Sequence, residues 1–240
     1  MQMLGLKPIP SDIEILDQCP MVRLAVLVLR YAESHGPLRL TRSGAFKRVF
    51  VKFAYETLGF YNCDIEEYGH NNVLNEASFG MLEVAHQVLI DIEAGEHLRG
   101  CFRITELGKS LQTQPEELFR RFFPQFLFVI NHAHYGGVED NPRCEWDAAL
   151  NTIDQLPDGS SFIDLCVEIG NPTTQNHNPK NNLHAEIDRG ILRPLTWIGM
   201  LDQRFAKIEG VGVYTYHRTK LWNAIFELNR DLLDRTASTT

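Results

Sequence analysis

Two stretches of the chain share a pattern in which an alternating segment leads into a helix. Residues 101–108 have the sequence CFRITELG, and residues 213–222 have the sequence VYTYHRTKLW. Alternation of apolar and polar side chains is typical of a half-buried strand. A second alternating segment precedes each stretch across a glycine, Gly100 in one case and Gly210 in the other. We therefore predict two β-hairpins, near residues 96–105 and 204–217, each followed by a helix.

The elements expected upstream of the two hairpins repeat in the same order, helix, strand, helix and helix. In the first half, Ser43 is predicted to cap the second helix and Gly59 to end it. In the second half, Gly190 and Pro194 are expected to break the third helix. The predicted helices cover residues 21–34, 43–58 and 75–94 in the first half, and 145–156, 162–169, 183–202 and 221–233 in the second; a short strand is predicted at 38–41.

An aromatic helical segment separates the two halves. Five phenylalanines lie within residues 119–128, and Pro124 is expected to kink or split the helix that carries them. Core packing between two domains is the usual explanation for such a stripe, and an exposed partner interface is the alternative. The candidate interface residues are Phe119, Phe122, Phe123 and Phe126. Residues 132–143, rich in glycine, acidic residues and asparagine-proline, are the expected linker.

The chain resembles winged-helix proteins, in particular bacterial winged-helix regulators, in which a helix ends at an apolar, glycine-containing corner and a β-hairpin then returns to a threonine that starts the next helix. The residues that carry the resemblance are the corner Ile198-Gly199-Met200-Leu201, the return Thr219-Lys220-Leu221-Trp222 and the similar segment 101–108. The resemblance implies a mainly α fold with small β-wings, an α+β class. It also implies an arm at 1–20, a first winged-helix domain at 21–112, a helical connector and linker at 113–144, a second winged-helix domain at 145–235 and a tail at 236–240.

The net charge of −8 disfavours wholesale phosphate binding, but the charge is unevenly distributed. Residues 1–60 hold eight basic and five acidic side chains, whereas residues 61–100 hold one basic and eight acidic ones. Two basic clusters are candidates for contact with DNA. They comprise Arg42, Lys47, Arg48 and Lys52 in the first half, with Arg39 beside them, and Arg189, Arg193, Arg204, Lys207, Arg218 and Lys220 in the second.

Two functions fit the resemblance. The first is a DNA-binding transcriptional regulator, because winged-helix proteins usually place the third helix in the major groove and the wing on the backbone. The acidic third helix of the first half assigns most of that contact to the second half. The second is a protein-interaction scaffold or adaptor with no direct DNA contact, as in chromosome-partition complexes. The expected partners are thus duplex DNA or a protein, and a homodimer is possible.

The sequence offers little for catalysis or for a cofactor. GxSxG, GxGxxG, GxxxxGK[ST] and HExxH strings are absent, so we expect no enzyme activity and no cofactor. His132, His134 and Cys144 could supply three metal ligands, and Glu83 with His86 has the spacing of a di-iron helix; neither set is complete, so no metal is expected. The five cysteines are expected to be reduced thiols, and the chain is expected to be cytoplasmic, without a membrane span.

Overall fold

The computed structural model describes residues 5–7, 16, 19–59, 74–132, 146–170, 183–208 and 210–227. The chain divides into two compact units. The N-terminal unit is Ser11–Ile130, and the C-terminal unit combines Met1–Pro10 with Asn131–Thr240. Each unit contains helices and one three-stranded antiparallel sheet, which confirms the α+β class. The expected linker after residue 132 and the expected tail at 236–240 lie outside the described residues.

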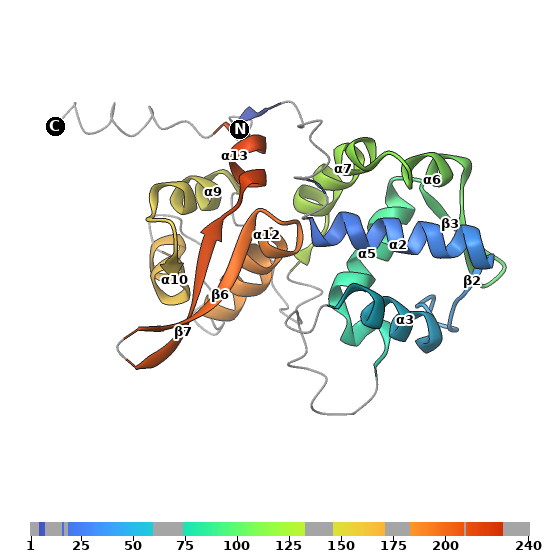
Figure 1. The fold of residues 1–240 in the computed structure, drawn as a ribbon, viewed down its shortest axis with the longest axis horizontal. Helices are drawn as coiled ribbons and strands as arrows, with labels where there is room; N and C mark the ends of the chain where they lie inside the picture. The colour runs from blue at the N-terminus through green and yellow to red at the C-terminus, as the bar shows by residue number, and fades with distance from the viewer. Residues whose placement is uncertain are drawn as a thin grey trace. The chain divides into compact units, whose positions relative to one another are not determined.

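In the N-terminal unit, helix α2 lies at the centre of the core. Seven of its side chains are buried, and the helix packs against α3, α5, α6, α7 and strand β4 (Figure 1). The described elements of this unit are α2 (Pro20–His35), β2 (Leu38–Arg39), α3 (Arg48–Leu58), η2 (Glu76–Ser78), α5 (Gly80–Asp91), β3 (Gly95–Leu98), β4 (Cys101–Ile104), α6 (Glu106–Leu111), α7 (Pro115–Pro124) and η3 (Gln125–Val129).

In the C-terminal unit, β6 and β7 are the longest described strands and form a hairpin. Its strands pair from Leu201 and Arg218 out to Ile208 and Val211, and the two run together as a ribbon in Figure 1. The described elements are β1 (Gly5–Leu6), α9 (Trp146–Gln155), β5 (Ser160–Ser161), α10 (Phe162–Ile169), α11 (Leu183–Ile187), η5 (Asp188–Leu192), α12 (Arg193–Trp197), β6 (Leu201–Ile208), β7 (Val211–Arg218), α13 (Lys220–Ile225) and β8 (Phe226–Glu227).

The three-stranded sheets of the two units have the same strand order. It is β2-β4-β3 in one and β5-β7-β6 in the other, so the last strand of each hairpin is central. Both predicted hairpins are therefore confirmed. In each unit the third helical region is followed by the hairpin, and a further helix begins directly after it.

One threonine closes each hairpin against the end of the preceding helix. The Thr105 hydroxyl donates to the carbonyl of Glu93 (2.7 Å) and accepts from the N–H of Gly108 (3.0 Å). The Thr219 hydroxyl donates to the carbonyl of Gly199 (2.7 Å) and accepts from Trp222 (3.3 Å). Glu93 and Gly199 both have positive φ, 61° and 82°. The two corners are thus built from the same hydrogen bonds.

The aromatic segment lies within the core of the N-terminal unit. Its four candidate interface rings are at most 2% exposed, and α7 and η3 pack against α2 and α5. Phe128 is the exposed ring of this segment, at 37%. The expectation that Phe119, Phe122, Phe123 and Phe126 form a partner interface is therefore wrong, because their helical spacing directs all four rings inward. The predicted change at Pro124 is confirmed, since α7 ends there and a π-helical turn follows.

Of two helical predictions in the C-terminal unit, one is confirmed and one needs correction. The α-helix of the third helical region is interrupted near Gly190 by a π-helical turn, Asp188–Leu192, and Pro194 lies near the start of α12, where its missing N–H is tolerated. The last helix ends at Ile225 instead of residue 233. Phe226 is extended and pairs with Leu6, so part of the expected N-terminal arm is a strand of this unit.

Candidate nucleic-acid interface

The start of helix α3 is a cationic surface of the N-terminal unit. The helix begins at Arg48, after Lys47 in the N-cap position, and no side chain caps it. Its internal bonds begin with Phe50 and Val51, whose N–H groups donate to the carbonyl of Lys47. The first N–H groups of an α-helix have no partner inside the helix and favour an anion. This end of α3 therefore has the polarity of a phosphate site.

Exposed basic side chains surround this helix start. Arg42, Lys47 and Arg48 are exposed, and so is Lys52, one turn along the helix from Arg48. Lys52 lies 3.6 Å from Glu56, and both side chains are more than 60% exposed, so solvent screens that ion pair. Arg48 and Lys52, four residues apart, thus share an exposed face of α3 with the apolar side chain of Val49, and Arg42 and Lys47 are exposed in the segment that precedes it.

A tight turn holds Arg42 in the segment that leads into the helix. The Thr41 hydroxyl accepts from the N–H of Ala45 (3.1 Å) and shares a hydrogen bond with the Ser43 hydroxyl (3.0 Å). Gly44 has φ of 87°, which glycine adopts without strain. Ser43 was expected to cap the helix, but it belongs to this turn, and α3 begins five residues later.

A chain of three polar side chains, two of them buried, lies beneath the 41–47 turn, the segment from Thr41 to Lys47. The Phe46 N–H donates to the Glu76 carboxylate, whose other oxygen lies 2.8 Å from Nδ1 of His86. Nε2 of His86 lies 2.8 Å from Nε2 of His97. Glu76 is 2% and His86 6% exposed, whereas His97 is exposed on strand β3. The chain therefore runs from the core to the surface of the hairpin.

The rings around His86 hold this chain in place. Phe46 stacks on His86 with centroids 3.9 Å apart, and Phe102 meets the same imidazole edge-on at 5.4 Å. Burial, and then the charge of His86, lowers the pKa of His97 from its usual 6.5, although Glu76 acts in the opposite direction. His86, considered with Glu83 for a di-iron spacing, is a hydrogen-bonded core residue. Its partner is Glu76, which no local spacing indicated.

The basic residues of the C-terminal unit are more strongly engaged by acidic neighbours. Arg218 lies 3.4 Å from Asp154 and 3.7 Å from Asp158, and its side chain is only 20% exposed. Arg193 pairs with Asp188 at 2.9 Å, and Arg204 with Asp202 at 2.7 Å. Arg218 is therefore a tether between β7 and α9, not the exposed phosphate contact that was expected. Lys207 and Lys220 are exposed, and Arg189 is half-buried.

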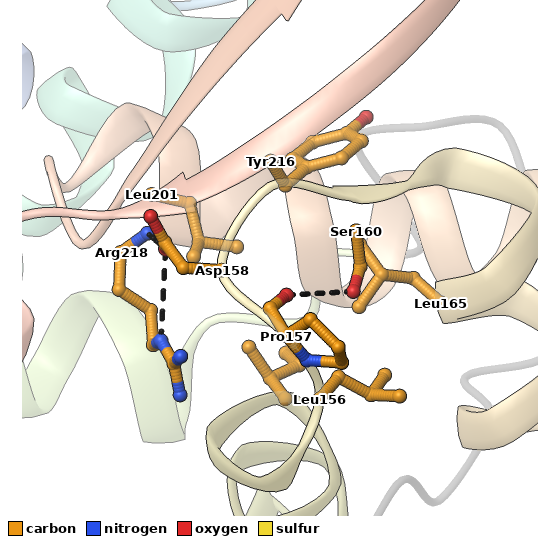
Figure 2. A pocket seen from close by; sticks show the side chains of 9 residues that line it. Leu156, Pro157, Asp158, Ser160, Leu165, Leu201, Tyr216 and Arg218 are labelled. Atoms are coloured by element: carbon orange, nitrogen blue, oxygen red, sulfur yellow. Dashed lines mark hydrogen bonds and ion pairs between the residues drawn. The ribbon is translucent and has the colours of Figure 1, made fainter.

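A shallow hollow beside Arg218 offers no unengaged catalytic group. Figure 2 shows Arg218 directed toward Asp158, and the Ser160 hydroxyl donating to the carbonyl of Pro157 (2.7 Å). Its remaining walls are mainly apolar, with Leu156, Leu165 and Leu201 among them. Burial alone raises the pKa of Asp158, but the backbone N–H of Arg218 and the His217 ring bring it below 3.8. This hollow is a structural junction.

The groups considered for metal binding or catalysis do not assemble in the part of the chain that the structure describes. His132 is buried, and His134 and Cys144 lie outside that part. Across the described ranges, no group of three or more His, Cys, Asp or Glu side chains is arranged to hold a metal ion. Burial raises the pKa of Cys19 and of Cys166 to about 12, which keeps both thiols protonated near neutral pH.

Two comparisons relate the chain to known proteins, and one of them falls on the N-terminal unit. Residues 17–117 match the family model described as the Y4jL N-terminal domain. The uncharacterized protein y4jL of Sinorhizobium fredii (strain NBRC 101917 / NGR234) is 28% identical over 166 residues, which cover 66% of this chain and 74% of that protein. No solved structure matches the chain. The range that matches the family model, residues 17–117, contains helix α3 and the Glu76–His86–His97 chain.

None of the helices in the described ranges combines the length and the apolar character that a bilayer crossing requires.

Proposed function

We propose that both units are winged-helix domains and that the chain binds double-stranded DNA without catalysing a reaction. The shared element order, the shared strand order and the two threonine-closed hairpins support the domain assignment. In winged-helix proteins the second helix lies over the DNA backbone, and its N-terminus is a natural phosphate contact. A role as a transcriptional regulator is the corresponding biological function.

The single observation that carries the proposal is the surface at the start of α3. Arg42, Lys47 and Arg48 are exposed there beside a helix terminus that no side chain caps. Phosphate would supply the missing acceptor for the first N–H groups of the helix and would pair with the three cations. The charge pattern of the sequence assigned the main contact to the C-terminal unit. The half-buried ion pairs of Arg193 and Arg218 now shift the proposed contact to the N-terminal unit.

The third helix of the N-terminal unit is poorly suited to reading bases in the major groove. Helix α5 carries Glu83 and Asp91, and its Gln87 side chain donates to Asp91 (2.7 Å). Gln125, from η3, donates to the same carboxylate (2.9 Å), so part of α5 is covered by its own unit. Carboxylates facing phosphates are repulsive. We therefore expect binding dominated by phosphates, with weak sequence preference.

Fluorescence anisotropy with a random-sequence duplex at several salt concentrations tests this function. Replacing Lys47 and Arg48 with alanine removes two phosphate contacts, so affinity falls and the salt slope decreases by about two. The matched control replaces Arg23 and Arg30, which are exposed on α2, and removes the same charge. If both double variants weaken binding equally, only net charge matters. A folded wild type that binds no duplex at low salt contradicts the proposal.

One observation favours the scaffold function as the second candidate. The outer part of the β6–β7 hairpin exposes Phe205 (63%), Val211 (64%) and Tyr214 (49%), and helix α10 exposes Ile163 and Val167. The rings of Phe205 and Tyr214 meet edge to face, with centroids 5.6 Å apart, beyond the part of the sheet that β5 covers. Exposed apolar side chains of this kind are common in protein-binding surfaces. Absence of duplex binding would make this function the leading one.

A further inference from the structure

The 41–47 turn rests directly on the contact between His86 and His97. The Phe46 N–H is bound by Glu76, and the Phe46 ring covers His86. On the other side, a Cβ added at Gly44 would lie 3.9 Å from Cε1 of His97. The same turn carries Arg42 and Lys47 to the start of α3. A change at the two imidazoles is therefore transmitted to the cationic surface through one short segment.

The hydrogen bond between the two imidazoles tolerates only certain protonation states. Two Nε2 atoms 2.8 Å apart share one hydrogen, so one nitrogen must donate and the other must accept. Nδ1 of His86 is directed at the Glu76 carboxylate. One imidazole of the pair can be cationic while the bond persists. When both are cationic, both Nε2 atoms carry hydrogens, and the contact is lost.

We propose that the His86–His97 contact is a proton-sensitive latch, which holds the 41–47 turn and its phosphate-binding cations in place only while one imidazole is neutral. This regulation rests on the proposed function. The charges that act on His97 come from His86 on α5 and Glu76 on η2. Strand β4 and the turn contribute the rings of Phe102 and Phe46. The carboxylate on the same strand, Glu96, is paired in register with Arg103, on the opposite face of the sheet from His97.

The direction of the effect follows from the pKa of His97. The folded chain holds this pKa below 6.5, so the open or unfolded chain binds the proton at a higher pH than the latched form. The latch is at full strength above pH 6.5 and is lost as the pH falls from 6.5 through the lowered pKa. DNA affinity should fall with it, by at most about tenfold per pH unit for one linked proton. Simple protonation of a histidine near phosphate would act in the opposite direction.

Duplex anisotropy between pH 7.5 and 5.5 at constant ionic strength tests the latch. The glutamine amide of His97→Gln can donate to His86 or accept from it but does not titrate, so the variant should keep its affinity where wild type loses it. The control His35→Gln, an exposed histidine of the same unit, should follow wild type. Parallel profiles for wild type and His97→Gln would overturn the latch.

An NMR titration of the wild-type imidazoles separates this inference from the proposed function. It requires neither DNA nor a folded variant. A His97 pKa below 6.5, with a second response at His86, supports the latch even if no duplex binds and the DNA proposal fails. An ordinary His97 pKa, insensitive to His86, overturns the latch even if duplex binding is strong.

Discussion

The second helices of the two units occupy the same place in the order of elements and present opposite surfaces. Helix α3 begins at Lys47 and Arg48 with no side-chain cap, whereas α10 begins with a capping box formed by Ser161 and Asp164. The capping box binds the N–H groups of Ser161 and Asp164 and places a carboxylate at the start of α10, which disfavours an anion there. Helix α10 also exposes Ile163 and Val167. Shared topology therefore positions a helix terminus, and the side chains at that terminus decide what it can bind.

The hairpin corners, in contrast, are nearly identical. Thr105 and Thr219 make equivalent hydrogen bonds, and three residues before them Phe102 and Tyr216 fill equivalent core positions on the central strands. Phe102 is fully buried and Tyr216 is 5% exposed. The comparison thus separates positions that maintain the fold in both units from positions that differ because the surfaces differ. Substitutions at matched positions test this separation.

The largest effect is expected from Phe102→Ala. The ring packs against Phe46 and His86 and lies over Gly95, where no side chain would fit. Its removal should lower the free energy of unfolding of the N-terminal unit by about 3–5 kcal/mol. Urea unfolding, with hydrogen exchange at the β3 and β4 amides, measures the loss. Tyr216→Phe is the matched variant, because it gives the C-terminal unit the same ring as its counterpart Phe102. It should lower the free energy of unfolding far less, since only the hydrogen bond from Gln203 to the Tyr216 hydroxyl is lost. Equal losses of unfolding free energy in the two variants would show that Phe102 and Tyr216 do not fill equivalent core positions.

An intermediate effect is expected from Thr105→Val and Thr219→Val. Each variant keeps the shape of the side chain but removes the hydroxyl that caps the following helix and binds the corner carbonyl. The free energy of unfolding of the affected unit should fall by ~1–2 kcal/mol in both cases. Similar values from denaturant unfolding would sharpen the comparison. A fall in unfolding free energy in only one unit would show that the two corners contribute differently to stability.

The smallest effect is expected from exchanging the corner residues. Glu93 has a left-handed backbone that disfavours a side chain, whereas its counterpart is Gly199. Glu93→Gly should therefore raise the free energy of unfolding by ~1 kcal/mol or less, and Gly199→Ala should lower it by a similar amount. Thermal unfolding of the two variants measures the signs. Destabilisation by Glu93→Gly would indicate that the Glu93 side chain has a role of its own.

Much of the fold could be predicted because short-range patterns carry it. Alternation identified both hairpins, and Gly59 ends α3 with positive φ as its position suggested. Helical spacing identified the aromatic segment but not its surroundings, so the same pattern was compatible with a core and with an interface. The candidate site was only half predictable. The cluster of Arg42, Lys47, Arg48 and Lys52 is visible in the sequence, whereas the half-buried ion pairs of Arg193 and Arg218 are not.

The sequence by itself determined the order of elements, the two glycine-turned hairpins and the position of the basic residues. Tertiary structure alone decided which charges remain available, because Arg218 meets Asp154 across 64 residues of chain. It also decided the chain from Glu76 through His86 to His97, whose members come from three different elements. The physical reason is range: periodicity and capping act within a few residues, whereas burial, ion pairing and shared protons depend on which segments the folded chain brings into contact.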